Sequence, residues 1–234
     1  MPTISLEKVT KTYKGKGRER RGPAIQDITF QFEQGEFIYL TGSRGAGKTT
    51  VLDIIAGELT PDSGAMFVDG VNVKRMGMIQ RGRFFRSIGR VSPEKGELVR
   101  SQTILQNLIP KKKTGKNVDV ALILKSLALV GMGGSENKYP ADFSISECRR
   151  IELARAILQS PAILLLDEIT DRVNDDTVWD MLHLLNELNS SLGTTVIMAT
   201  NASQVVNVMR KRVITLADGK LVGDVKRGRL GYIG

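Results

Sequence analysis

The chain has 234 residues, 41% hydrophobic and 25% charged, an ordinary composition for a globular protein with one large core. No apolar run approaches the roughly 20 residues that a membrane-spanning helix needs. The first residues lack the basic and then apolar pattern of a secretory signal. Cys148 is the single cysteine, which excludes an internal disulfide and favours a reducing compartment. We therefore expect a cytoplasmic protein.

The net charge of +9 is the unusual bulk feature, and the cations are densest at 14–21, 111–116 and 226–229. Solvated loops are the plainest interpretation of these segments. An anionic membrane surface or an acidic partner would also suit them. No aromatic residue is interleaved with the cations, which disfavours nucleic acid as a partner.

Strand and helix patterns alternate along the chain. We expect strands at 4–9, 27–32, 36–40, 65–69, 162–166, 195–199 and 213–216. We expect helices at 49–56 and 176–192, and a helical stretch from about 94 to 158 that is clearest at 118–130 and 146–158. This order predicts an α/β fold with a mostly parallel sheet and a helical insertion.

A glycine-rich turn between the 36–40 strand and the next helix has the pattern G-x-x-x-x-G-K-S/T. The predicted nucleotide-binding residues in it are Gly42, Ser43, Arg44, Gly45, Ala46, Gly47, Lys48, Thr49 and Thr50. Glycines let backbone N–H groups point at phosphate oxygens, and the helix N-terminus adds partial positive charge. Lys48 would reach the β- and γ-phosphates, and the Thr49 hydroxyl would ligate Mg²⁺.

The apolar strand 163–166 ends in two carboxylates, Asp167 and Glu168. Buried carboxylates need partners, so this placement indicates a site. Asp167 can hold Mg²⁺, and Glu168 can polarise the water that attacks the γ-phosphate. Together with the glycine-rich turn, this strand end predicts binding of Mg-ATP and its hydrolysis, with Lys48 and Glu168 as catalytic residues.

Over nearly its whole length the chain resembles the ATP-binding-cassette ATPases. The residues at the position of their LSGGE signature are Ser144, Ile145, Ser146 and Glu147. The resemblance implies a P-loop NTPase cassette with an antiparallel β part near the N-terminus. It implies one domain over 1–234, with a RecA-like core at about 1–92 and 160–234 and a helical subdomain at about 93–159. It also implies that Tyr13 stacks on adenine.

Within this family the chain is most similar to the FtsE group of cell-division ATPases, of the Gram-positive type. The similarity rests on the GAGK run at 45–48, the segment 212–220 and the tail at 226–232. It implies a transmembrane partner of the FtsX type, an ATP-dependent dimer and a place at the inner face of the membrane. ATPases of lipoprotein and macrolide export share much of the same core.

Three positions depart from the family. The Q-loop glutamine falls on Pro93, which has neither a side-chain amide nor a backbone N–H. The switch histidine falls on Asn201, and the only histidine, His183, lies in the predicted 176–192 helix. The signature glycines are Ile145 and Ser146, and Ile145 adds bulk where the family brings backbone close to a phosphate.

We therefore expect Mg-ATP binding to survive and hydrolysis to be slow. One lost positioning contact costs roughly 10²–10³ in rate in comparable enzymes. Two alternatives remain open: a heterodimer in which a second cassette supplies a complete signature, and a degenerate module that binds ATP and acts structurally.

Overall fold

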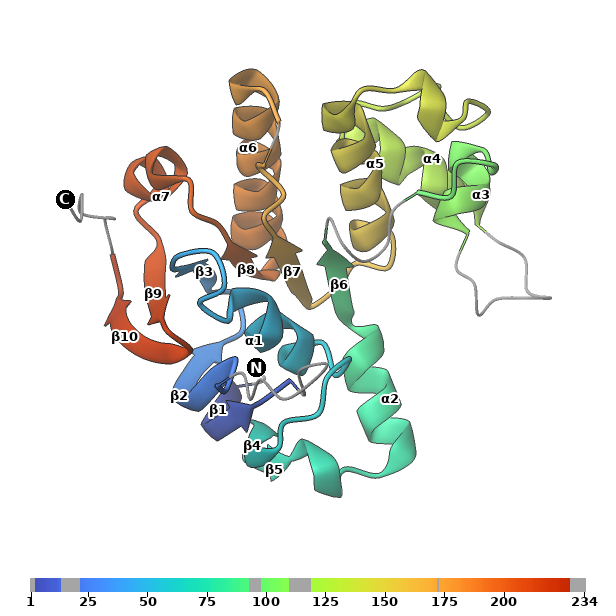
Figure 1. Ribbon diagram of the computed structural model, residues 1–234. Helices are drawn as coiled ribbons and strands as arrows, with labels where there is room; N and C mark the ends of the chain where they lie inside the picture. Colours follow the sequence, from blue (N-terminus) through green and yellow to red (C-terminus); the bar gives the residue numbers. More distant parts are fainter. Residues whose placement is uncertain (1–2, 14–21, 93–97, 110–118, 172, 228–234) are drawn as a thin grey trace.

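Two β-sheets organise the part of the chain that the computed structural model describes, residues 3–13, 22–92, 98–109, 119–171 and 173–227 (Figure 1). The central sheet has six strands in the order β10-β9-β3-β8-β7-β6, with β10 antiparallel to β9 and all other neighbours parallel. Its strands are β3 (Phe37–Thr41), β6 (Ile88–Val91), β7 (Ile163–Asp167), β8 (Thr195–Ala199), β9 (Arg212–Ala217) and β10 (Lys220–Val225).

The second sheet is antiparallel, in the order β2-β1-β4-β5. Its strands are β1 (Thr3–Lys11), β2 (Ile25–Glu33), β4 (Ser63–Val68) and β5 (Val71–Asn72). The two sheets touch where the Gln26 N–H donates to the Gly219 carbonyl at 2.7 Å. Helix α1 (Lys48–Ile55) shares one hydrophobic core with this antiparallel sheet and the central sheet.

Both faces of the central sheet are covered around β3, β7 and β8, which explains why these three strands are buried along their whole length and mostly apolar. Along β7, Ile163 and Leu165 belong to the core on the α1 face, whereas Leu164 and Leu166 belong to the core on the opposite face. Successive strand residues point to opposite faces, so a strand covered on both sides is a continuous apolar run.

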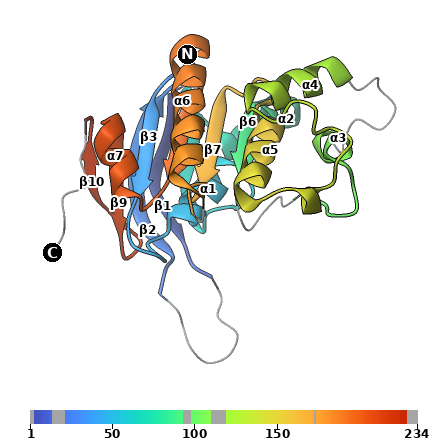
Figure 2. The same ribbon diagram turned by 90° about the horizontal axis from the view of Figure 1, so that it is seen from above.

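Helices contribute the rest of the core on the second face. They are α3 (Ile104–Leu108), α4 (Val120–Leu129), α5 (Ile145–Ile157), α6 (Asp175–Leu192) and α7 (Ser203–Met209). Figure 2 shows α3, α4 and α5 gathered beyond the β6 edge of the sheet, with α7 beside β9 and β10. No helix in the described part of the chain is long and apolar enough to cross a membrane.

The predicted α/β fold with a mostly parallel sheet is confirmed, and each predicted strand and helix lies within a few residues of its observed place. Six elements of the described chain had not been predicted: the strands β5, β6 and β10, the helices α2 (Met78–Arg86) and α7, and the short helix η1 (Val73–Arg75). No side chain of α2 is fully buried and only Phe84 and Phe85 pack against the core, so the helix has no continuous apolar stripe that a periodicity argument could detect. The predicted helical stretch from 94 to 158 is broken, in chain order, into α3, α4, the turn η2 (Pro140–Asp142) and α5. Residues 94–97 and 110–118 of this stretch lie outside the described residues.

Tyr39 gives a test of this packing. It lies in β3 and is fully buried, and within the described chain its hydroxyl has no hydrogen-bond partner. Burial raises the pKa of Tyr39, so the phenol stays neutral. Because an unpaired buried polar group costs about 1–3 kcal/mol, Tyr39→Phe should raise the free energy of unfolding by about 1 kcal/mol.

Urea denaturation of both proteins measures this difference. Tyr39→Ala is the control and should lower the stability by about 3–5 kcal/mol, because it leaves a cavity. A phenylalanine variant less stable than the wild type would show that the hydroxyl has a partner.

Candidate functional site

The loop between β3 and α1 has a backbone that only glycine can supply at two places. Gly42 has φ +144°, and a Cβ there would lie 2.2 Å from the Leu216 carbonyl oxygen. Gly47 has φ +101°, and its Cβ would lie 2.6 Å from the Ala24 carbonyl oxygen. Strands β9 and β2 therefore hold the loop from outside, and the sequence pattern of the loop follows from these two close approaches.

The N-terminus of α1 follows this loop. Gly47 precedes the helix, no side chain caps it in the described structure, and its first turn carries no acidic residue. The first N–H groups of a helix have no partner within the helix, so they favour an anion. An uncapped helix behind a glycine-rich loop fits a phosphate group.

The side chain of Lys48 is the centre of a polar cluster and is only 6% exposed. Its ammonium group donates to the Gly42 carbonyl at 2.7 Å and to the Ser43 carbonyl at 3.2 Å. It also donates to Asn201 Oδ1 at 3.2 Å and pairs with Glu168 Oε1 at 3.2 Å. The loop after β3, the end of β7 and the loop after β8 thus meet at one ammonium group.

Asp167 ends β7 and is 3% exposed, and its Oδ1 atom has no hydrogen-bond partner among the described residues. Burial raises the pKa of Asp167, against the hydrogen bond from Thr49 and the charge of Arg90. A buried carboxylate oxygen without a partner beside a threonine hydroxyl fits Mg²⁺. This ion is usually held by one or two carboxylates together with substrate phosphates.

Glu168 follows Asp167 in a left-handed backbone conformation, with φ 47°. Its N–H donates to the Ala199 carbonyl at 3.0 Å, at the end of β8. This conformation is uncommon for a residue other than glycine, and such residues cluster at functional sites. The backbone turn directs the carboxylate toward Lys48 while a third of the side chain stays exposed.

Tyr13 follows β1 and reaches the same loop region. Its hydroxyl lies 3.3 Å from Thr50 Oγ1, and 46% of the residue is exposed. The chain before it is held by Asp62, which pairs with Lys11 at 2.7 Å and accepts from the Thr12 N–H at 2.8 Å. The ring is therefore accessible beside the start of α1, as stacking on a base would require.

The signature positions form the start of α5. Ser144 caps the helix, and its hydroxyl donates to Glu147 Oε2 at 2.7 Å. The Ser144 N–H and hydroxyl lower the pKa of Glu147. Ile145 is 55% exposed, so its side chain stands in solvent at the helix start beside Ser146.

Other predicted positions have mixed outcomes. Pro93 lies outside the described residues. Asn201 contacts Lys48, a contact that the motif alone did not predict. His183 is exposed in α6, as expected for a surface residue.

Arg90 had not been singled out from the sequence. It lies in β6, pairs with Asp53 of α1 and lies 3.0 Å from Glu58, so it joins the edge of the central sheet to the helix behind the loop. It also lowers the pKa of Asp167 through its charge. The one available signal was a cation within a short apolar strand.

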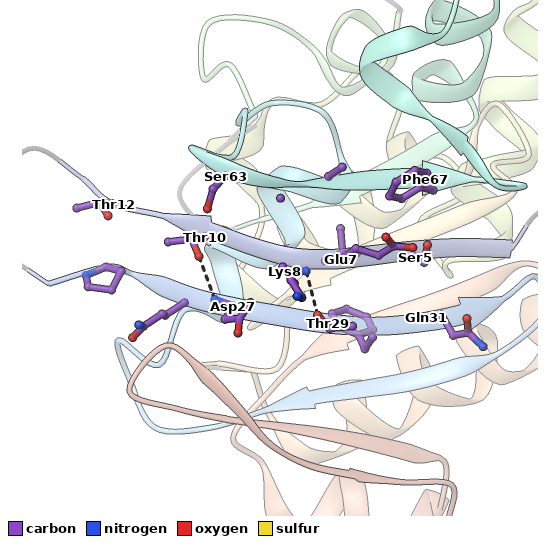
Figure 3. A pocket seen from close by; sticks show the side chains of 16 residues that line it. Ser5, Glu7, Lys8, Thr10, Thr12, Asp27, Thr29, Gln31, Ser63 and Phe67 are labelled. Atoms are coloured by element: carbon purple, nitrogen blue, oxygen red, sulfur yellow. Dashed lines mark hydrogen bonds between the residues drawn. The ribbon is translucent and has the colours of Figure 1, made fainter.

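A hollow of ≈ 1090 Å³ lies elsewhere, on the outer face of the antiparallel sheet. Figure 3 shows Ser5, Glu7, Thr29 and Gln31 along it. Its lining includes no residue of the 42–49 loop and neither Asp167 nor Glu168. The polar cluster around Lys48 therefore lies apart from this hollow.

Comparisons with known proteins agree with this geometry. The family model described as "ABC transporter" matches residues 25–171. The chain belongs to the ABC transporter family. The fold is that of an ATP-binding cassette: the dimeric ATP-binding cassette MJ0796, in a post-hydrolysis state bound to ADP and Pi, superposes with a TM-score of 0.84. That match has 28% sequence identity and covers 97% of this chain and 100% of the other.

Curated relatives of this chain have names that are more specific than the name of the family. The cell division ATP-binding protein FtsE of Mycobacterium tuberculosis is 34% identical, over 97% of this chain and 98% of its own length. FtsE of Escherichia coli is also 34% identical, over 95% of this chain and 98% of its own. The methionine import ATP-binding protein MetN of Bartonella henselae is 32% identical over 86% of this chain.

Asp167→Asn tests the metal-binding part of the site. The amide keeps the shape of the side chain and removes its charge, so ADP affinity should no longer rise when Mg²⁺ is added. Calorimetric titration with ADP, with and without Mg²⁺, measures this. Asp176→Asn, an exposed change in α6, is the matched control and should retain the effect of Mg²⁺. A magnesium effect of unchanged size in Asp167→Asn would contradict the assignment.

Proposed function

We propose that the protein is the ATP-binding subunit of an FtsE/FtsX-like complex in cell division, with a transmembrane partner of the FtsX type. The observation that carries the ATPase assignment is the meeting of Lys48, Glu168 and Asn201 beside Thr49 and Asp167. Similarity to FtsE proteins over nearly the whole chain supports the biological role. The cassette would act at the cytoplasmic face of the membrane.

The roles follow from the contacts. Residues of the 42–50 loop would bind the phosphates, and Tyr13 would stack on adenine. Thr49 and Asp167 would hold Mg²⁺, which when bound offsets the charge of the β- and γ-phosphates. Lys48 would exchange its loop carbonyls for phosphate oxygens, and Glu168 would accept a proton from the attacking water. We assign 1–92 and 160–234 to a RecA-like core and 93–159 to a helical subdomain.

Hydrolysis is proposed to be slow because the groups that position water and the γ-phosphate are altered. The side-chain Oδ1 of Asn201 already accepts a hydrogen bond from Lys48, and the side-chain amide can donate a hydrogen bond but cannot take up a proton at neutral pH. Pro93 offers neither donor nor amide oxygen in its side chain. Such losses need not multiply, since residues that act together are not additive.

The ATP-bound form is proposed to be a homodimer, as in the dimeric cassette MJ0796. Ser144 would contact the phosphate across the interface after releasing Glu147. The exposed Ile145 side chain would then lie at the contact and weaken closure. In a heterodimer, a second cassette would supply a complete signature to the phosphate loop of this chain. Pro93 and Asn201 of this chain would remain unchanged.

A structural role without appreciable hydrolysis is the second candidate, favoured by the exposed Ile145 at the helix start. The third candidate function is the ATPase of a related lipoprotein- or macrolide-type exporter, since such an ATPase would have a core similar to that of this chain. The first two differ in turnover and the third differs in its membrane partner.

One experiment separates turnover from ATP-driven assembly. Purified protein is incubated with Mg-ATP, and phosphate release and the monomer–dimer shift are followed together, with Glu168→Gln alongside. We expect an ATP-dependent dimer and slow release in the wild type, and the same dimer with still less release in the variant. Wild-type turnover at the roughly 10 s⁻¹ typical of enzymes would contradict slow hydrolysis. Dimerisation without any release would favour the structural role.

Restoring the family residues should raise turnover. Asn201→His combined with Ile145→Gly should increase the rate of phosphate release by about tenfold or more, because each restores a group that contacts the γ-phosphate in the family. His183→Asn, an exposed change in α6, is the control and should leave the rate unchanged. If the rate of phosphate release does not rise in the double variant, Asn201 and Ile145 are not the residues that limit turnover.

A further inference from the structure

The segment that includes η1 and α2 is the most one-sidedly charged part of the described chain. No acidic residue occurs between Asp69 and Glu94. The cations of this segment are Lys74, Arg75, Arg81, Arg83, Arg86 and Arg90. Arg90 is buried against Asp53, whereas the others are exposed.

Helix α2 is firmly attached on its inner side. Phe84 and Phe85 pack against the core that contains α1 and the antiparallel sheet. Phe85 lies so close to Gly57, just after α1, that a Cβ on the glycine would be 2.3 Å from the ring. The helix end is also fixed, because the Ser87 hydroxyl donates to the Phe84 carbonyl at 2.7 Å.

The outer side of α2 combines apolar and cationic side chains. Ile79, Arg83 and Arg86 are spaced by four and three residues, so they share one helix face. Ile79 is 78% exposed and its neighbour Met78 is 89% exposed, values unusual for large apolar residues. Within the described residues, the side chains of Lys74, Arg75, Arg81, Arg83 and Arg86 form no ion pair; Arg81 lies over the Phe85 ring, 5.8 Å from its centre.

We propose that this surface, residues 74–86, docks on an anionic phospholipid surface. Met78 and Ile79 would enter the boundary between headgroups and acyl chains, as the apolar residues of interfacial helices do. The arginines would bury their stems and keep their guanidinium groups at the phosphates. Each cation close to such a surface raises the affinity roughly fivefold.

The chemistry favours lipid over an acidic protein partner. Among the described residues, the two most exposed large apolar side chains, Met78 and Ile79, stand at the start of α2, and cations flank them on both sides in the sequence. A fluid, anionic boundary satisfies both kinds of group without a shaped groove. The proposal rests on the proposed function only in placing the cassette beside a membrane.

The test is co-sedimentation of the full chain with vesicles, without nucleotide. Vesicles of equimolar phosphatidylglycerol and phosphatidylcholine are compared with vesicles of phosphatidylcholine alone. We expect binding to the anionic vesicles only, weakened by salt. Arg83→Glu should reduce the affinity by roughly tenfold or more, since it removes one attraction and adds one repulsion. Ile79→Ser should reduce it by several-fold through lost apolar burial.

Lys220→Glu is the matched control. It makes the same charge change at an exposed site in β10, at the far edge of the central sheet from β6, and should have a much smaller effect. An equal loss of affinity for anionic vesicles in Lys220→Glu and in Arg83→Glu would overturn the proposal, because binding would then depend only on the net charge of the protein. No binding by the wild type would overturn it too, as would vesicle binding by both α2 variants at the wild-type level.

Binding of ATP by the same preparations keeps the two proposals apart. If a variant no longer binds vesicles but still binds ATP, its fold and its nucleotide site are intact. Wild-type protein that binds anionic vesicles but not ATP would contradict the proposed function and leave the lipid surface standing. If α2 variants bind vesicles normally but lose a transmembrane partner, the surface is a protein interface and the lipid proposal is wrong.

Discussion

The hydrogen-bonded position of the Lys48 ammonium group is the interaction on which the site depends. It lies against two carbonyls of its own loop, one oxygen of Asn201 and the Glu168 carboxylate. These four acceptors come from three loops far apart in the sequence. They meet because parallel strands β3, β7 and β8 are neighbours and end at the same edge of the sheet. The sheet order therefore determines which residues can meet at the Lys48 ammonium group.

Burial of the central sheet on both faces has a second consequence. It requires the interiors of β3, β7 and β8 to be apolar, so the polar residues of these strands occur at their ends, as Thr41 does in β3 and Thr195 in β8. Asp167, at the last position of β7, is the charged one, a buried carboxylate whose Oδ1 atom has no hydrogen-bond partner among the described residues. Such a group is costly unless it meets a cation, which is a physical reason to place Mg²⁺ there. Arg90 limits this cost by its charge.

Much of the fold could be predicted from the sequence, for reasons that these residues make plain. The buried strand β7 is a continuous apolar run followed by a carboxylate, and α6 is amphipathic over 18 residues, so both can be read from the sequence. The glycine-rich loop could be recognised because Gly42 and Gly47 have backbone angles and close contacts that exclude other residues. Short elements such as α2 and α7 could not, because propensity and pattern are weak over seven to nine residues.

For the site, the sequence indicated the residues but not their mutual contacts. It identified Lys48, Asp167 and Glu168 separately, and their meeting follows from the sheet order. Asn201 was identified as a missing histidine, whereas the structure adds that its amide oxygen holds Lys48. Arg90 was missed because its partners, Asp53 and Glu58, lie on α1 and just after it, more than thirty residues away along the chain. Contacts of this kind depend on three-dimensional packing and have no local pattern.

The most direct test of the account is the affinity of the protein for ATP with and without the Lys48 side chain. Equilibrium titration of Mg-ATP into the wild type and Lys48→Ala measures it. A hydrogen bond to a charged group contributes about 1.5–3 kcal/mol, so the account predicts that the variant binds about tenfold or more weakly, with its fold intact by thermal melting. Equal affinities in the two proteins would contradict the claim that this loop binds the phosphates.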